Sequence, residues 1–110
     1  MRVLLDGCVP KQLKNSLVGH EVETAPEMGW GDLDDGPLLN VMARRFDALV
    51  TVDKSLRYQQ NLTRRPFGVA VLRAKTNRLK DLLPLVPELL EALGKIRPGE
   101  IIEIERLVRS

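Results

Sequence analysis

The 110-residue sequence contains one cysteine, one histidine, one tryptophan and only 4% aromatic residues. A single cysteine excludes a disulfide within the chain and a zinc site built on a cysteine pair, and it favours a reducing cytoplasm. A lone histidine without a recognisable serine or cysteine partner gives little support for nucleophilic catalysis. With so few rings, leucine and valine must fill the core of the single domain, residues 1–110, that this length predicts.

Several segments typical of other protein classes are also missing. No stretch approaches the ~20 apolar residues of a membrane span, and Asp6 interrupts the opening apolar residues too early for a secretory signal. The first predicted strand is not followed by G-x-G-x-x-G, and the P-loop pattern G-x-x-x-x-G-K-[ST] is absent. The acidic pair and strand-end lysine of a phospho-acceptor receiver are missing too. We therefore expect a cytoplasmic protein with no membrane partner, and neither a dinucleotide site nor a P-loop.

Short apolar runs bounded by turn residues predict the strands. The predicted strands are residues 3–5, 21–24, 46–53, 68–72 and 100–105. The uninterrupted apolar runs suit central strands, whereas the mixed polarity of the second and last suits sheet edges. Helical leucine spacing between the strands gives a β-α-β order, which predicts a mainly parallel central sheet covered on both faces, a three-layer α/β/α fold.

The helix starts carry their own residue preferences. Pro10 suits the first turn of one helix, with Leu13, Leu17 and Val18 as its apolar stripe, and Asp35 is well placed to cap the next. Ser55 is the expected cap of a short helical piece after the third strand. Two prolines, at positions 84 and 87, cannot both lie inside one regular helix. We expect a short turn there, followed by a helix that starts near one of them.

Acidic residues follow two of the predicted strands. Asp6 ends the first apolar run and Asp53 ends the third strand, and parallel strands bring their carboxyl ends to one rim. Asp35, at a helix start, can join them there. The alternative for Asp6 is a helix cap without chemistry. Carboxylates gathered at one rim repel each other unless a cation lies between them, and oxygen ligands alone suit Mg2+ or Mn2+.

The charges of the chain are unevenly distributed. Residues 21–35 contain six acids and no Lys or Arg, whereas residues 44–80 contain ten bases and two acids, a net charge of 10 − 2 = +8. On one face these bases would attract a polyanion, and the alternative is scattered solvated side chains. The candidate substrate-binding residues near the strand ends are Lys54, Arg57, Arg73 and Lys75. Together with a cation at the acids, they predict metal-assisted hydrolysis of a phosphodiester.

Four segments, LLDGCVP, GWGDLDDGPLL, LVTVDKSL and GVAVLRAKTNRL, resemble in order and spacing the short stand-alone PIN-like proteins, which are related to the PilT N-terminal nuclease domain and to VapC-type toxins. The resemblance covers residues 1–93. It implies that Asp6, Asp35 and Asp53 are the metal-binding and catalytic acids, that Mg2+ or Mn2+ is the cofactor, and that the chain is an RNA-cleaving ribonuclease. It further implies a toxin role, a small antitoxin partner and a homodimer.

The chain departs from this family at one position. Members usually carry Glu after the first Asp, where this chain has Gly7. If that Glu helps to hold metal or water, the alternative function is a catalytically weak or inactive PIN-like binding or regulatory module. Asp34 can replace or assist Asp35, and Asp81 is a fourth acid that fits equally well the first turn of a helix.

Three residue types that occur once each have a functional and a structural interpretation. Cys8 lies two residues after Asp6, but a small buried thiol is favoured. His20 is favoured as a loop residue without a chemical role. Trp30, between two glycines, either stacks on a base or covers an edge of the core, and packing is favoured.

Overall fold

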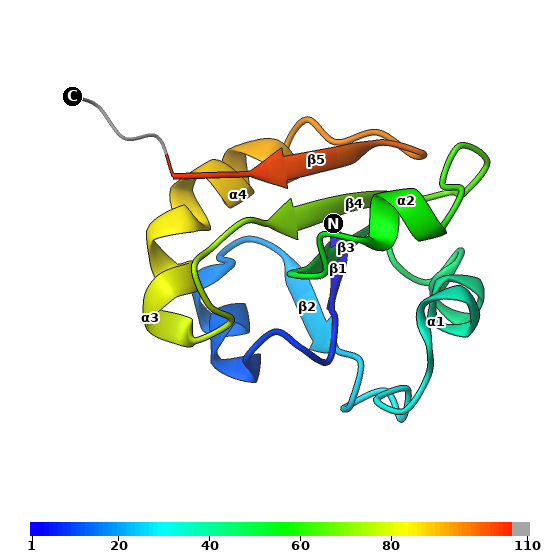
Figure 1. Cartoon of the computed structure of the whole chain (residues 1–110), viewed down its shortest axis with the longest axis horizontal. Helices are drawn as coiled ribbons and strands as arrows, with labels where there is room; N and C mark the ends of the chain where they lie inside the picture. Colours follow the sequence, from blue (N-terminus) through cyan, green and yellow to red (C-terminus); the bar gives the residue numbers. More distant parts are fainter. Residues whose placement is uncertain (107–110) are drawn as a thin grey trace.

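One sheet of five parallel strands lies at the centre of the molecule, in the order β2-β1-β3-β4-β5 (Figure 1). The strands are β1 (Arg2–Leu5), β2 (Glu21–Thr24), β3 (Ala48–Thr51), β4 (Gly68–Leu72) and β5 (Ile101–Ile104). The computed structural model describes residues 1–106, without the side chains of residues 57 and 58. The predicted parallel sheet is confirmed, and β2 and β5 are its edge strands, as their mixed polarity predicted.

The strand order reverses at β1, which has β2 on one side and β3 on the other. In open α/β sheets, a ligand crevice lies outside the carboxyl ends of the strands at such a reversal. The backbone N–H of Asp6 donates to the carbonyl of Val50 (2.9 Å), so the pairing between β1 and β3 continues to the first acid. The topology therefore marks the end of β1 and β3 as the place to look for a site.

Helical segments connect the strands. They are η1 (Lys11–Ser16), α1 (Asp35–Met42), α2 (Leu56–Gln59), α3 (Leu79–Leu82), η2 (Leu83–Leu85) and α4 (Val86–Leu93), where η marks a 3-10 helix. The interruption predicted from Pro84 and Pro87 is confirmed, because η2 separates α3 from α4 and Pro87 lies in the first turn of α4. Within residues 1–106, none of these helices has the length and apolar composition needed to cross a membrane.

The segment after Pro10 differs from its prediction. It is a 3-10 helix, and Val18, predicted on the buried stripe, is 79% exposed. Leu13 and Leu17 are buried as expected. The helix ends early because Leu17 leaves helical geometry and Gly19 adopts a left-handed φ of 89°, which turns the chain back toward β2.

The helix starts near the acids also differ in detail. Asp34, not Asp35, is the N-cap of α1, because its backbone is extended and its carbonyl accepts the N–H of Leu38 (2.9 Å). Asp35 is therefore the first residue of the helix. Ser55 is the N-cap of α2 as predicted, but its side chain does not cap the backbone. Its hydroxyl donates to Asp53 instead.

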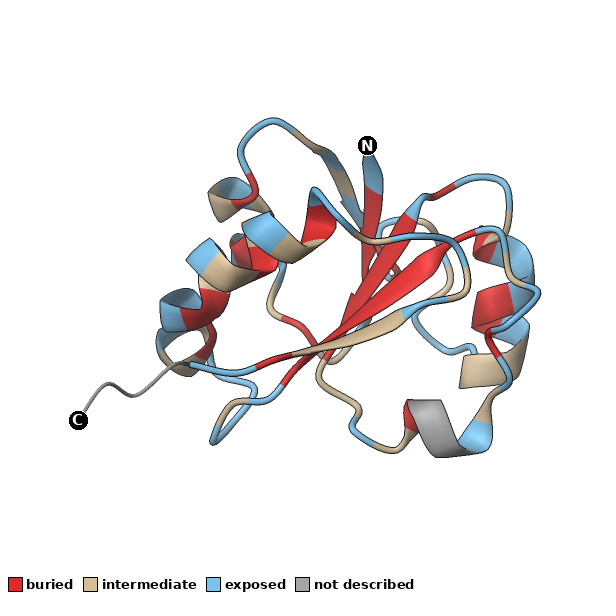
Figure 2. Cartoon of the chain, turned by 90° about the horizontal axis from the view of Figure 1, so that it is seen from above, coloured by how far each residue is buried: buried red, intermediate tan, exposed pale blue. Residues whose placement is uncertain are grey.

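Alternate residues of the strands enter two separate apolar clusters. Val3 and Val50 join the cluster that contains residues of η1, α3 and α4. Leu4 and Leu49 join the cluster that contains residues of α1 and α2. Figure 2 shows the buried central strands in red between helical segments on either side. Burial on both faces explains why the central strands are continuous apolar runs in the sequence.

Candidate active site

Asp6, directly after β1, is held by the neighbouring strand. Its Oδ2 accepts the hydroxyl of Thr51 (2.7 Å), and its Oδ1 accepts the N–H of Gly7 (2.8 Å). Thr51, the last residue of β3, is fully buried, and its hydroxyl oxygen also accepts the N–H of Asp53 (3.1 Å). One buried hydroxyl therefore links the first acid to the backbone of the third. The helix-cap alternative for Asp6 is wrong, because the N-cap of η1 is Pro10.

Cys8 is half-buried beside the same carboxylate. Its Sγ donates to Asp6 Oδ2 (3.6 Å) and lies 3.7 Å from Thr51 Oγ1. Burial raises the pKa of the Cys8 thiol above its ordinary value, and the nearby charge of Asp6 raises it further. The thiol is thus kept protonated at neutral pH and serves as a weak donor to Asp6. Cys8 also packs at the margin of the first apolar cluster, in line with the packing interpretation.

Asp53, two residues after β3, has its own pair of donors. Its Oδ1 accepts the hydroxyl of Ser55 (2.6 Å) and the backbone N–H of Ser55 (3.0 Å). The Ser55 hydroxyl is the main cause that lowers the pKa of Asp53 below its ordinary value. Hydrogen bonds to an ionised carboxylate stabilise that form. Asp53 therefore stays ionised across the neutral range.

Asp35 behaves in the opposite way. Burial at the start of α1 raises its pKa to about 6, and a hydrogen bond with Asp53 together with repulsion from Asp53, Asp6 and Asp34 adds to the shift. The carboxyl group of Asp35 thus lies within interaction range of Asp53 and Asp6, and both raise its pKa. As the pH falls, Asp35 is therefore protonated before Asp53.

The acids do not form a complete metal cage by themselves. Within residues 1–106, no group of three or more His, Cys, Asp or Glu side chains is arranged to hold a metal ion. Asp6 instead bonds to Thr51, while Asp35 and Asp53 meet as a pair. Mg2+ is commonly held by one or two carboxylates, with waters and substrate phosphate completing the shell. In its chemistry, the oxygen-only donor pair fits Mg2+ or Mn2+.

Of the predicted substrate-binding residues, Arg73 has contacts that direct it away from this pair of acids. Arg73, directly after β4, forms ion pairs with Glu103 on β5 (2.9 Å) and with Glu105 (3.5 Å). These contacts hold its guanidinium on the β5 side of β4, whereas the acids follow β1 and β3. Lys54 and Lys75 are exposed. The side chain of Arg57 lies outside the described residues.

Sequence reasoning missed the two hydroxyls that position the acids. Thr51 and Ser55 each lie two residues from Asp53, the spacing at which short polar side chains form local hydrogen bonds. The sequence pattern T-x-D-x-S therefore indicates that these two hydroxyls can form hydrogen bonds near Asp53. From the sequence, Ser55 is predicted only as a helix cap.

Other residues with a suggested function have structural contacts. Trp30 packs edge-on against Phe46, with ring centroids 6.0 Å apart, and Arg45 lies 5.2 Å above the Trp30 ring, which agrees with the packing interpretation. Asp81 lies in the first turn of α3 and accepts the hydroxyl of Thr76. His20 differs from these residues, because its buried Nδ1 has no hydrogen-bond partner within residues 1–106, and burial lowers the pKa of its imidazole.

Comparison of the chain with protein-family models, curated proteins and solved structures found no significant match.

Proposed function

We propose that the chain is a three-layer α/β/α PIN-like ribonuclease that hydrolyses RNA phosphodiester bonds with Mg2+ or Mn2+. The observation that carries the proposal is that Asp6 and Asp53 follow the neighbouring strands β1 and β3, with the Asp35 carboxyl group within interaction range of both. The order and spacing of these acids in the sequence, and their resemblance to the PIN-like pattern, support the same conclusion.

The electrostatics explain why a cation belongs at this place. Asp35 ionises only against burial and the charges of Asp53 and Asp6. A divalent cation would offset that repulsion, because an opposite charge within a few ångströms favours the ionised carboxylate. Carboxylate oxygens as the only donors favour Mg2+ or Mn2+ over zinc.

The residues of the site have different roles. Asp35 and Asp53 would hold the cation, which when bound polarises a phosphate oxygen and lowers the pKa of a bound water. Ser55 keeps Asp53 ionised and oriented through two hydrogen bonds. Thr51 and the N–H of Gly7 fix Asp6, which adds negative charge near the pair. The toxin role, the antitoxin and the homodimer follow from the family resemblance alone, and the cytoplasmic location from the sequence composition.

The proposal is tested by titrating the chain with Mn2+ and measuring cleavage of a labelled single-stranded RNA in parallel. Asp53→Asn is expected to lose both Mn2+ binding and cleavage, because the pair keeps only one carboxylate. Asp32→Asn, a change of the same type in the exposed loop before α1, should retain both. Absence of cleavage and of Mn2+ binding in the wild type, or equal cleavage by Asp53→Asn, would contradict the proposal.

Gly7 favours a second candidate, a PIN-like module that binds RNA but cleaves it weakly or not at all. A Cβ added at Gly7 would meet only Gly31 O and Pro26 Cγ, both at 4.0 Å, so the position has room for the acid that the resembling proteins carry. Gly7→Glu is therefore expected to fold normally and to increase Mn2+ affinity and cleavage. Substantial cleavage by the wild type that Gly7→Glu does not improve would argue against this second candidate.

A further inference from the structure

A turn directly after β1 carries Asp6, and its backbone sets the orientation of this acid. The N–H of Val9 donates to the carbonyl of Asp6 (2.9 Å), which closes the turn. The N–H of Gly7 donates to Asp6 Oδ1 (2.8 Å), and the Sγ of Cys8 donates to Asp6 Oδ2 (3.6 Å). The direction of the carboxylate therefore depends on the next two residues as well as on Thr51 of β3. A group that fixes the backbone of this turn also fixes the first acid.

Asn77 provides such a group from a distant part of the sequence. Its Nδ2 donates to the backbone carbonyl of Cys8 (3.1 Å), which lies 69 positions earlier in the chain. Asn77 belongs to the segment between β4 and α3, so the bond joins this segment to the turn after β1. The turn is thus held from outside at Cys8, between the two residues Asp6 and Val9 whose backbones close it.

The backbone on either side of Asn77 is fixed by hydrogen bonds of its own. The hydroxyl of Thr76 donates to Asp81 in the first turn of α3 and accepts the N–H of Arg78 (3.0 Å). Short polar side chains stabilise turns in this way. Asn77 lies between Thr76 and Arg78, so its carboxamide extends from a segment that already has a defined position.

The two segments that the bond joins rest on the same apolar surface. Cys8 from the turn and Ala74 and Leu79 from the segment before and at the start of α3 all pack against the apolar cluster on the η1, α3 and α4 side of the sheet. A hydrogen bond between groups that are already ordered loses little conformational entropy when it forms. The bond from Asn77 to Cys8 is therefore suited to holding the turn in one position.

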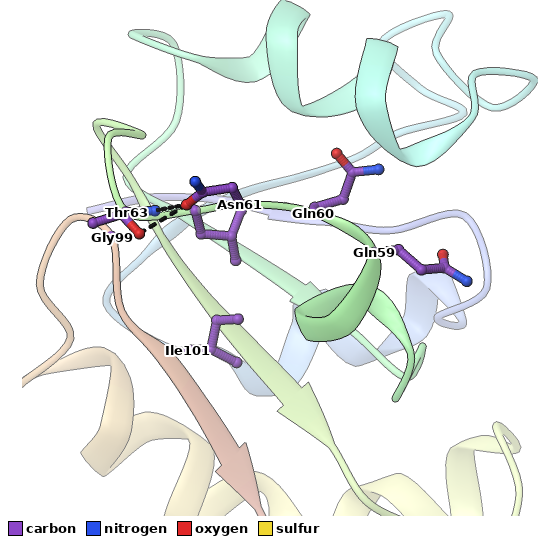
Figure 3. A pocket seen from close by; sticks show the side chains of 7 residues that line it. Gln59, Gln60, Asn61, Thr63, Gly99 and Ile101 are labelled. Atoms are coloured by element: carbon purple, nitrogen blue, oxygen red, sulfur yellow. Dashed lines mark hydrogen bonds between the residues drawn. The ribbon is translucent and has the colours of Figure 1, made fainter.

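Asn61 is a contrasting example, because its carboxamide serves only its own loop. Its Oδ1 accepts the N–H (3.0 Å) and the hydroxyl (2.7 Å) of Thr63, shown as dashed lines in Figure 3. Asn61 lines a hollow together with Gly99 and Ile101, at the start of β5. Because all five strands are parallel, this is the rim opposite to the one where the acids lie. Asn61 is thus a matched control for Asn77, with comparable hydrogen bonds far from Asp6.

We propose that Asn77 is a positioning residue of the active site, which holds the turn after β1 so that Asp6 stays directed toward Asp35 and Asp53. It acts through the backbone of Cys8 and not by contact with the cation or the RNA. A neutral carboxamide fixes the turn without cancelling the negative charge that attracts a cation. The inference rests on the proposed ribonuclease function for the role of Asp6, and it adds to that function a residue from the opposite side of the turn.

Amide hydrogen exchange of the metal-free full chain, followed by NMR, tests the hold on the turn. Asn77 is exposed, so Asn77→Leu should fold, and it removes the Nδ2 donor without changing the charge. Exchange of the Gly7 and Val9 amides should become about three- to tenfold faster, the effect expected for one neutral hydrogen bond. Asn77→Asp keeps the shape but replaces the donor with an oxygen, so it should have the same effect. Asn61→Leu should leave both amides unchanged.

Three results of this measurement overturn the inference, whether or not the chain is a ribonuclease. They are unchanged exchange in Asn77→Leu, an equal acceleration in Asn61→Leu, and full protection in Asn77→Asp, which would show that the side chain only fills space.

A double-variant cycle with Mn2+ tests whether the effect reaches the site through Asp6. Asn77→Leu should weaken Mn2+ binding about three- to tenfold in the wild type but less than about twofold in Asp6→Asn, because the turn then has no carboxylate to position. Asn61→Leu should change neither affinity. An equal loss in both backgrounds, or no loss in the wild type, overturns the positioning role and leaves the ribonuclease proposal intact. A wild type that binds no Mn2+ overturns both, even where the exchange data show that Asn77 holds the turn.

Discussion

Two parts of the same sheet rim handle charge in different ways. After β4, Arg73 is neutralised by Glu103 and Glu105 of the neighbouring strand segment. After β1 and β3, Asp6 and Asp53 lie next to Asp35, and in the described residues no Lys or Arg forms an ion pair with any of the three. Uncompensated like charges of this kind are more typical of functional sites than of structural ones. The contrast indicates that the acids are arranged to bind something that the chain does not itself supply.

The hydrogen bonds around the acids support the same contrast. Thr51 and Ser55 orient Asp6 and Asp53 with neutral hydroxyls, which fix a carboxylate without cancelling its charge. The guanidinium of Arg73 both fixes and cancels the charge of its partners. Neutral positioning groups therefore preserve the negative potential at the end of β1 and β3, which a cation requires.

The largest effect is expected from Asp35→Asn. The variant should bind Mn2+ and cleave RNA more than about 100-fold less well, since even partners outside the ligand shell are worth 10–100-fold. It should also be more stable at pH 7, by roughly 1 kcal/mol after allowance for solvent screening, because the charge that burial and Asp53 oppose is gone. Denaturant unfolding and Mn2+ titration of the same samples measure both changes.

Asp32→Asn serves again as the control and should change neither quantity. An Asp35→Asn variant that is less stable and cleaves normally would show that Asp35 is only a favourable acid at the start of α1. That result would remove the contrast between the two parts of the rim.

The next effect is a pH dependence of cation binding. With the pKa of Asp35 at about 6, the carboxylate is mostly ionised at pH 7 and mostly protonated at pH 5, so Mn2+ affinity should fall about tenfold between them. For stability the sign is opposite. The folded chain binds an extra proton between the ordinary pKa of 3.8 and about 6, so this group's contribution to stability decreases as pH rises through that window. Mn2+ titrations of the wild type at the two pH values should show the change in affinity. Unfolding of the metal-free proteins should show that the stability of Asp35→Asn depends less on pH than that of the wild type.

The central part of the fold was predictable because its cause is local in the sequence. β1, β3 and β4 are buried on both faces, and this produces uninterrupted apolar runs such as residues 68–72. The 3-10 helix η1 was not predictable in the same way. The turn at Gly19 that shortens it is set by the need to start β2 beside β1, where Arg2 pairs with Glu21.

The candidate site was predictable to a similar extent. Asp6 and Asp53 end neighbouring parallel strands, so the topology alone places them at one rim. The contact of Asp35 with Asp53 depends on how the loop before α1 returns to the sheet, which spacing does not specify. The pairing of Arg73 with Glu103, 30 positions later in the chain, depends on the register of β4 and β5, which the sequence alone does not specify.

The smallest effect is expected from Arg73→Ala. Partly exposed ion pairs contribute about 0–1 kcal/mol, so the free energy of unfolding should fall by no more than about 1 kcal/mol. Because Glu103 and Glu105 hold the guanidinium on the β5 side, the KM of Arg73→Ala for RNA cleavage should stay within about threefold of the wild-type value. Lys11→Ala, which removes an exposed charge on η1, is the control and should show the same small change in KM. A KM that rises tenfold for Arg73→Ala alone would return Arg73 to the substrate-binding residues predicted from the sequence. Both parts of the rim would then contact RNA, and the division between compensated and uncompensated charge would no longer separate structure from function.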